Sequence, residues 1–234
     1  MQKQRDTEVI ITVDFLQSVR LFSNLSRTEI ERIKPYFFPR KYRRREIIYL
    51  KGDPSQTLYI IHNGQVKLSE ISESGREQAL LILNKGDFFD VVSIIDEGPY
   101  PTTATALSDV LLYAIRKQDM QTITSKYPAV ANAILPYLSG ILREMTDMVA
   151  EISFESVTVR ISKLILRYAE IQGVPTSDGV LVKRTLTHQE IADIVGTDRE
   201  VVTRSLIDLQ KQGVIDLEED KQILIRDMGK LQNS

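Results

Sequence analysis

Four polar side chains near the start of one predicted helix have the types and spacing that specific hydrogen bonding requires. They are Arg199, Glu200, Thr203 and Arg204. A helix over Asp198–Lys211 turns about 100° per residue, which places these four side chains on one arc of its first two turns. Val202, Leu206 and Leu209 fall on a separate, apolar arc suited to packing. Arginine donates two hydrogen bonds to guanine and glutamate accepts one from cytosine, so we expect the polar arc to read base edges in the major groove of DNA.

The alternative interpretation of this arc is an ordinary solvent-exposed helix face. A Glu200–Arg204 pair at i,i+4 spacing would then contribute only about 0.3–0.5 kcal/mol. The preceding residues favour the functional interpretation, because Thr187–Glu190 and Thr197–Glu200 both have the spacing of a capping box and the glycine between them is suited to end a helix. Two capped helices joined by a short turn are typical of a helix-turn-helix, in which Thr187, Thr197 and Thr203 are expected to contact phosphates.

The residues on either side of this helix pair predict a complete domain. Val214–Leu217 and Ile223–Ile225 are short apolar runs that flank the acidic turn Glu218–Lys221, as in the β-hairpin of a wing. Upstream, an apolar periodicity predicts a helix over Val157–Ile171, followed by a turn rich in glycine and proline. Residues 157–234 are therefore predicted to form a winged helix-turn-helix domain that binds double-stranded DNA.

Glycine spacing predicts a different architecture for the first half of the chain. Five glycines recur every 11 or 12 residues, at Gly52, Gly64, Gly75, Gly86 and Gly98. The short apolar or alternating runs near them are Leu58–Ile61, Val66–Ile71, Ala79–Leu83 and Val110–Ile115. Turns at this spacing are typical of an antiparallel roll or sandwich, so we expect residues 1–126 to form a β-roll.

Residues 127–156 are predicted to form a long helix with a heptad stripe. Pro128 is suited to a helix start, whereas Pro136 should kink the helix or move its start by a turn. The stripe extends farther than a small roll could cover, which favours pairing with a second copy of the helix over packing on its own sheet alone. The predicted dimer residues are Ile134, Leu138, Ile141, Met145, Met148 and Ile152.

The composition excludes several kinds of chemistry. The chain has no cysteine, so it has no disulfides, no cysteine-ligated iron–sulfur cluster, no thiolate haem ligand and no thiol redox sensor. Its two histidines, His62 and His188, are too few for a histidine-rich zinc site, and we expect no catalytic residues, metal or cofactor. Asp6, Glu8 and the lack of any long apolar run argue against a signal peptide or membrane span, which favours a cytoplasmic protein. At a net charge of −2, DNA binding requires a local basic face.

The most specific segment resembles the DNA-binding signature of the cyclic-AMP receptor/fumarate–nitrate reductase regulator (CRP/FNR) family. Its matching parts are His188–Gly196 and Arg199–Arg204. Segments that resemble the family's β-roll are Lys51–Asp53, Leu58–Lys67, Gly86–Phe89 and Ala104–Ala106. The resemblance covers about residues 15–226 and implies an α+β transcription regulator, with a cyclic-nucleotide-binding-like roll, a long dimerisation helix and a winged helix-turn-helix. It also implies a homodimer that binds an inverted repeat of TGTGA-like half-sites, with Arg199, Glu200 and Arg204 reading bases.

The effector site departs from the pattern that the resemblance implies. Cyclic-nucleotide-binding members have Gly-Glu-Leu followed by Arg-Ser-Ala, but Val91 stands here for the ribose-binding Glu and Thr102 for the phosphate-binding Arg. No Arg or Lys occurs between Asp87 and Leu112, so we do not expect cyclic AMP in its usual pose. An unidentified small-molecule effector is expected between the roll and the long helix. The residues predicted to line its pocket are Phe89, Val91, Thr102, Thr103, Met145 and Thr146.

Two other interpretations stay open at this point. A cupin-like enzyme would share the β-roll, but its metal site needs several histidines and carboxylates, and the roll offers only His62. A constitutively active regulator of the same fold would need no small-molecule ligand, which the altered nucleotide motif makes plausible. The basic run Arg40–Arg45 is suited to phosphate or to RNA polymerase, an expected partner, although a solvated strand edge is the commoner role of such a run.

Overall fold

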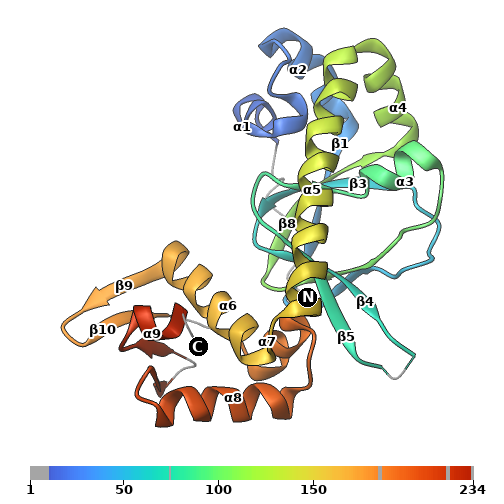
Figure 1. Ribbon diagram of the computed structural model, residues 1–234. Helices are drawn as coiled ribbons and strands as arrows, with labels where there is room; N and C mark the ends of the chain where they lie inside the picture. Colours follow the sequence, from blue (N-terminus) through green and yellow to red (C-terminus); the bar gives the residue numbers. More distant parts are fainter. Residues whose placement is uncertain (1–10, 74, 184–185, 220–221, 233–234) are drawn as a thin grey trace, which may run out of the picture. The chain divides into compact units, whose positions relative to one another are not determined.

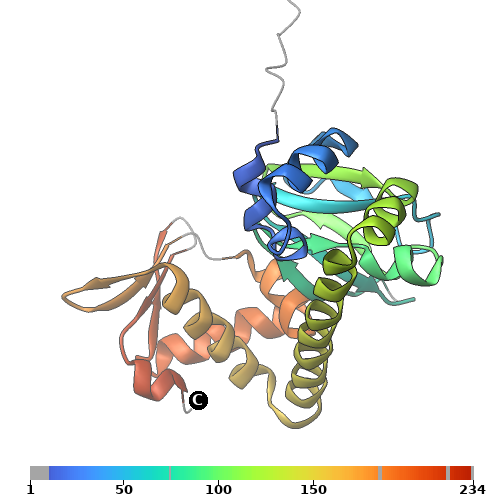
Figure 2. The same ribbon diagram turned by 90° about the horizontal axis from the view of Figure 1, so that it is seen from above.

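The computed structural model describes residues 11–73, 75–183, 186–219 and 222–232 (Figures 1 and 2). The predictions that concern Asp6, Glu8 and the end of the wing turn fall outside these residues. The chain divides into two compact units. The first holds the described residues up to Glu70 together with Leu80–Arg143, and the second holds Ile71–Ala79 together with the residues from Glu144 onward.

Two antiparallel four-stranded sheets form the roll of the first unit. One has the strand order β1-β8-β3-β6 and the other β2-β7-β4-β5. Their strands are β1 (Phe37–Tyr42), β2 (Ile47–Tyr49), β3 (Thr57–Asn63), β4 (Val66–Ile71), β5 (Glu77–Leu83), β6 (Phe88–Phe89), β7 (Thr103–Ala106) and β8 (Val110–Arg116). All four strands predicted from the apolar runs are confirmed. At the β3–β4 turn Gly64 has φ +89°, and a Cβ there would lie 2.5 Å from the Asp109 carbonyl oxygen, so this turn requires glycine.

Alternation along the strands separates two cores. On β8, Leu112 and Ala114 contribute to the core between the sheets, whereas Tyr113 and Ile115 contribute to a second core. This second core lies between the first sheet and the surrounding helices, because successive strand residues point to opposite faces (Figures 1 and 2). The helices and short 3₁₀ segments of this unit are α1 (Val13–Ser18), η1 (Arg20–Phe22), α2 (Arg27–Ile33), η2 (Lys34–Tyr36), α3 (Val91–Asp96) and α4 (Lys117–Lys126).

The predicted long helix is present as α5 (Pro128–Phe154). It begins at a proline, as expected, and it continues across Pro136, which is exposed. Its early residues Val130, Ile134 and Tyr137 are buried in the core that α1 and α2 share with the first sheet. The first turns of α5 are thereby fixed to the roll.

Four helices and a four-stranded sheet make up the described part of the second unit beyond α5. The helices are α6 (Val157–Gln172), α7 (His188–Val195), α8 (Arg199–Lys211) and α9 (Met228–Gln232). The strands are β9 (Gly173–Thr176), β10 (Gly179–Val182), β11 (Ile215–Leu217) and β12 (Ile223–Ile225), in the order β11-β12-β10-β9. The predicted wing hairpin is confirmed, because Asp216 pairs with Leu224. The turn expected after α6 is instead a second hairpin, β9–β10. Among the described helices, none is both long and apolar enough to cross a membrane.

Candidate nucleic-acid interface

A capped first helix and a left-handed glycine build the turn of the helix-turn-helix. The Thr187 hydroxyl accepts a hydrogen bond from the Glu190 amide (3.1 Å), and the Glu190 carboxylate accepts one from the Thr187 amide (2.7 Å). This capping box confirms the start of α7 as predicted. Gly196 ends the helix with φ +73°, a conformation that side chains with a Cβ adopt at a cost.

The second predicted capping box is absent, and this corrects the expectation for Thr197. Helix α8 begins at Arg199 with Asp198 as its N-cap, and the Asp198 side chain makes no capping hydrogen bond. Thr197 is only 8% exposed, because the Gly196 turn folds it inward and its amide donates to the Ala192 carbonyl (3.0 Å). Its hydroxyl therefore has little surface to offer a DNA phosphate.

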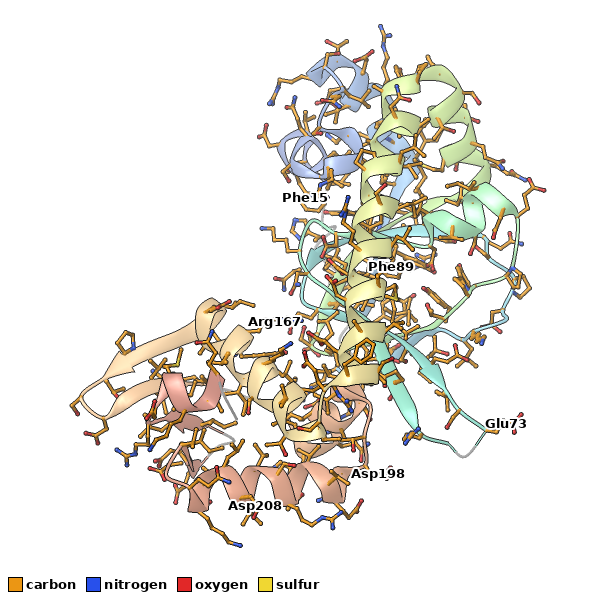
Figure 3. The ribbon with its side chains drawn as sticks, in the orientation of Figure 1. Phe15, Glu73, Phe89, Arg167, Asp198 and Asp208 are labelled. Carbon is orange, nitrogen blue, oxygen red and sulfur yellow. The ribbon has the colours of Figure 1, made fainter. Side chains whose placement is uncertain are left out.

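Helix α8 presents the predicted polar arc to solvent. Val202, Leu206 and Leu209 are buried in the core of the unit, as expected. On the remaining surface Arg199, Glu200 and Arg204 are exposed and Thr203 is half-buried. Figure 3 marks the helix by Asp198, just before its first turn, and Asp208 toward its end. Within the described residues no ion pair joins Glu200 to Arg204, so the simple surface-pair interpretation of the arc has no support in the structure.

Thr203 has a second role that the sequence did not reveal. Its hydroxyl donates to the Arg199 carbonyl (3.0 Å) and also lies 2.9 Å from Nδ1 of His188, the first residue of α7. Because the threonine proton is used within α8, His188 is assigned as the donor, which neutral imidazole can be. Burial, followed by the nearby Arg199 charge, lowers the pKa of His188 below its usual 6.5. The His188–Thr203 hydrogen bond links α7 to α8. In the sequence, the only sign of this bond was a histidine at a helix start.

A buried arginine holds the other end of α7. The Arg160 side chain is buried, its Nε donates to the Val195 carbonyl (2.9 Å), and its Nη1 donates to the Glu155 carbonyl (2.8 Å). A cation at a helix C-terminus is favoured by the exposed carbonyls and the helix dipole. Sequence reasoning missed Arg160, because nothing in the pattern of α6 distinguishes it from a surface arginine.

The roll interior contains stacked aromatic rings and a buried acid. Tyr49 stacks on Tyr100 with ring centroids 3.8 Å apart, and Tyr59 stacks on Phe89 at 5.2 Å. The Tyr49 hydroxyl donates to the Asp90 carboxyl group (2.5 Å). Burial raises the pKa of Asp90 well above its usual range, although the Tyr49 hydrogen bond opposes this. A buried carboxyl group among aromatic rings offers no positive charge to a phosphate.

Half of the residues predicted to contact an effector are buried in the packed interior. Phe89, Val91 and Thr103 are buried, and the Thr103 hydroxyl accepts a hydrogen bond from the Lys51 amide (3.1 Å). Thr102 is half-buried. On α5, Met145 is half-buried and Thr146 is exposed. No cluster of three potential metal ligands occurs among the described residues. The predicted effector pocket stays a prediction.

The exposed stripe of α5 is shifted by one residue from half of the predicted seam. Ile134 is 6% exposed and lies in the core of its own unit, and Ile141 packs against the same core. By contrast, Leu135, Leu142 and Val149 are 66%, 68% and 64% exposed. Along the helix these three residues alternate with the predicted dimer residues Leu138, Met145 and Ile152, at steps of three and four positions. The resulting heptad series is Leu135, Leu138, Leu142, Met145, Val149 and Ile152.

Comparisons with known proteins agree with this arrangement. Residues 39–127 match the cyclic nucleotide-binding domain family and residues 159–234 match the Crp-like helix-turn-helix domain. The chain is 31% identical over 201 residues to the CRP-like cAMP-activated global transcriptional regulator of Mycobacterium tuberculosis, a match that covers 86% of this chain and 88% of that protein. It is 32% identical over 197 residues to the cyclic AMP receptor protein of Thermus thermophilus, covering 84% and 88%.

A solved structure shows the same fold at lower identity. The c-di-GMP responsive global regulator CLP of Xanthomonas campestris superposes with a TM-score of 0.77 at 23% identity, covering 86% of this chain and all of that one (100%). These relatives are transcription regulators, which leaves no support for the cupin-like enzyme. The chain belongs to the CRP/FNR family of DNA-binding transcription regulators.

Proposed function

We propose that this regulator binds an inverted repeat as a homodimer, with Arg199, Glu200 and Arg204 contacting bases in each half-site. The observation that carries the proposal is the exposed polar arc over the first two turns of α8, opposite a fully buried apolar face. Arginine and glutamate at these positions favour G·C pairs, consistent with TGTGA-like half-sites. We expect the start of α7, just after Thr187, to contact a phosphate through the first amides of the helix, since the Thr187 amide and hydroxyl are themselves bonded to Glu190. Thr203 acts mainly by holding α8 against His188, and buried Thr197 is left out of the interface.

The second copy of the chain is expected to pair along α5. The heptad series contains the exposed residues Leu135, Leu142 and Val149, which alternate with the half-buried Leu138 and Met145 and the exposed Ile152. Apolar residues at this spacing pack well only against another helix with the same repeat. The predicted positions Ile134 and Ile141 lie one residue away from Leu135 and Leu142, and we assign them to the contact of α5 with its own chain. Met148 is half-buried and stays a predicted seam residue.

We further propose that cyclic AMP is not the effector of this chain, although two of its relatives are named for cyclic AMP. A cyclic nucleotide needs a cation for its phosphate, and the stretch from Phe88 to Leu111 has no Arg or Lys. Val91 is buried in the core between the first sheet and the helices, and Asp90 adds a buried acid nearby. DNA binding without any nucleotide is the expected behaviour, and a contact with RNA polymerase is the expected route to transcription control.

The experiment is selection of random double-stranded DNA by the purified chain, without ligand and at near-physiological salt. Enrichment of an inverted repeat with two G·C-containing half-sites is expected. An Arg204→Ala chain carried through the same selection should not enrich the repeat. The control is Arg167→Ala, which replaces an exposed arginine on α6 and should enrich the repeat as the wild type does. Equal enrichment by wild type and Arg204→Ala would overturn the assignment of α8 as the reading helix.

A further inference from the structure

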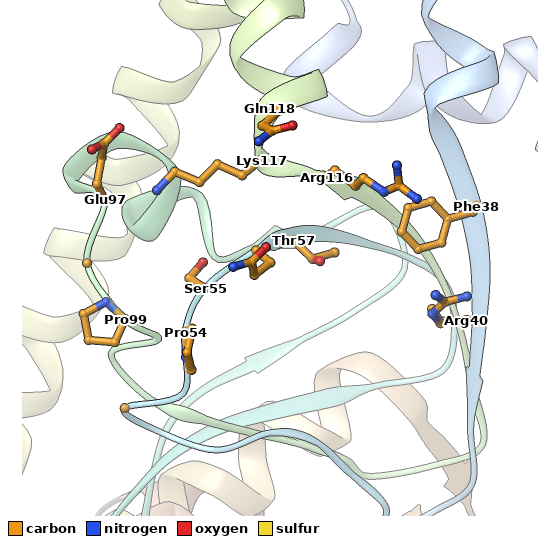
Figure 4. A pocket seen from close by; sticks show the side chains of 13 residues that line it. Phe38, Arg40, Pro54, Ser55, Thr57, Glu97, Pro99, Arg116, Lys117 and Gln118 are labelled. Carbon is orange, nitrogen blue, oxygen red and sulfur yellow. The ribbon is translucent and has the colours of Figure 1, made fainter.

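An open pocket on the first unit carries three basic side chains and one acidic side chain (Figure 4). Its volume is about 980 Å³, and it lies where the Gly52–Thr57 segment, the Glu97–Pro99 turn and the start of α4 meet. The charged residues that line it are Arg40, Glu97, Arg116 and Lys117. None of the residues that sequence reasoning assigned to an effector lines this pocket.

The walls of the pocket are joined by main-chain hydrogen bonds. Gly52 donates to the Tyr100 carbonyl (2.9 Å), and Tyr100 donates to the Asp53 carbonyl (3.0 Å). Lys117 donates its amide to the Gln56 carbonyl (2.9 Å), which fixes the start of α4 beside the same segment. The three segments therefore form a preorganised site, so a ligand would not have to order them.

The basic side chains are not neutralised by the protein. Arg40 lies over the Phe38 ring, 4.5 Å from its centroid, and Lys117 Nζ donates to the Ser93 carbonyl (3.2 Å). In the part of the chain that the structure describes, no carboxylate forms an ion pair with these two side chains or with Arg116. With Glu97 as the one lining acid, the pocket has an excess of two positive charges. Guanidinium and ammonium groups arranged around a cavity favour phosphate.

Ser55 supplies an independent observation that points to a ligand. It is only 9% exposed, and its hydroxyl makes no hydrogen bond within the described structure. The Tyr100 side chain is nearby, but no bond of acceptable geometry joins the two hydroxyl groups. Figure 4 shows the Ser55 hydroxyl on the side of its segment that faces Lys117. Buried hydroxyl groups nearly always have partners, so this one is suited to a ligand oxygen.

The start of α4 adds a further feature suited to anions. This helix has 10 residues, and its N-cap Arg116 makes no side-chain capping hydrogen bond. The first amides of a helix and the positive end of its dipole attract negative charge. The start of α4, the three basic side chains and Ser55 therefore all line the same pocket.

We propose that this pocket binds the phosphate group of a small phosphorylated metabolite. Arg116 and Lys117 compensate the phosphate charge, and the Ser55 hydroxyl donates to one of its oxygens. Phe38 and Pro99 provide apolar surface for the rest of the ligand. This site lies apart from Val91 and Thr102, and it does not depend on the proposed DNA sequence preference.

Calorimetric titration of the full chain with inorganic pyrophosphate, at constant ionic strength, tests the proposal. Saturable binding is expected, and Arg116→Gln should weaken it by about tenfold or more, because a charge-assisted hydrogen bond to phosphate is lost. Arg43→Gln is the matched control, since it removes the same charge from an exposed residue outside the pocket. Absence of saturable binding, or equal weakening in both variants, would overturn the proposal.

Ser55→Ala separates a binding role from a structural role. Because the Ser55 hydroxyl makes no hydrogen bond in the free protein, its removal should leave the melting temperature unchanged or slightly raised. Pyrophosphate binding should nevertheless weaken by at least about threefold. Unaltered pyrophosphate affinity in this variant would contradict the role of Ser55, and a marked fall in melting temperature would identify the hydroxyl as structural.

Discussion

The two units of this chain differ in the burial of the residues to which the sequence analysis assigns their functions. In the helix-turn-helix, Arg199, Glu200 and Arg204 are exposed on a helix whose opposite face is buried. In the roll, Val91 at the nucleotide-binding motif is buried, and the neighbouring Asp90 is bonded to Tyr49. A function carried by an exposed helix face can be inferred from periodicity, whereas an interior site depends on which distant residues share the core.

The largest expected effect concerns the exposed arc. Replacing Arg204 with alanine removes a bidentate base contact, and such a contact discriminates by about 1–3 kcal/mol in each half-site. A dimer loses it twice, so the affinity for the selected repeat should fall by about 100-fold or more, with little change in affinity for unrelated DNA. Fluorescence anisotropy on both DNAs measures this. If Arg167→Ala causes the same loss, general charge and not base reading explains the binding.

The dimer face of α5 should give the next largest effect. Leu142→Lys places two unpaired charges in the proposed seam, and burying an unpaired charge costs several kcal/mol. The dimer dissociation constant should rise by at least about 100-fold, as measured by sedimentation equilibrium. Ile171→Lys, a 77% exposed position at the end of α6, is the control and should sediment as wild type. An undisturbed Leu142→Lys dimer would exclude this register of the seam.

Substitution of the buried acid Asp90 should increase the stability of the fold, whereas most substitutions of buried residues lower it. Because the pKa of Asp90 is raised by burial, the folded state binds its proton more tightly than the unfolded chain. Stability contributed by that proton is full below the unfolded pKa and falls as the pH rises toward the folded pKa. Asp90→Asn keeps the neutral shape and suits the left-handed φ of +72°, so the free energy of unfolding at neutral pH should increase by about 1–2 kcal/mol.

Urea unfolding at pH 5 and pH 7.5 measures this effect, and the gain should be smaller at the lower pH. Ser93→Ala, another buried polar position of the roll, is a control that carries no titratable group. A lower stability of Asp90→Asn at neutral pH would mean that the carboxyl group is ionised and paired in the folded state.

The smallest expected effect is the titration of His188. Its pKa is lowered, so the unfolded state binds a proton more readily, and the neutral ring contributes stability that is lost as the pH falls below about 6.5. A proton NMR titration should place the His188 midpoint below 6.5, and His188→Asn should identify its signal against that of His62. Thr203→Val should move the midpoint, because the ring then loses its partner. A midpoint above 6.5 would show that His188 binds Thr203 in its charged form.

Much of the fold was predictable because its signals are local. The four central roll strands, α5 and the capped α7 follow from alternation, periodicity and the Thr187–Glu190 spacing. The β9–β10 hairpin was missed because its strands have only four residues each and include Pro175. Such short strands are stable only within the sheet that β12 completes.

The candidate sites were predictable only in part. The polar arc of α8 lies on a single helix, so helical periodicity alone is enough to predict its residues. The dimer seam of α5 stays a prediction. Ile134 and Leu135 are both apolar, and only packing against the roll, which buries Ile134, decides which of them is exposed. The Tyr49–Asp90 bond joins residues 41 positions apart, and no local pattern predicts it.

The most direct test of the contrast between the units is the affinity of the wild-type chain for its selected repeat, with and without saturating cyclic AMP. If α8 reads DNA and the roll lacks a cation for a nucleotide phosphate, as proposed, binding should be tight and sequence-specific, and cyclic AMP should not change it. Binding that appears only with cyclic AMP would contradict this directly, because the nucleotide would then have to bind a roll whose motif positions are Val91 and Thr102.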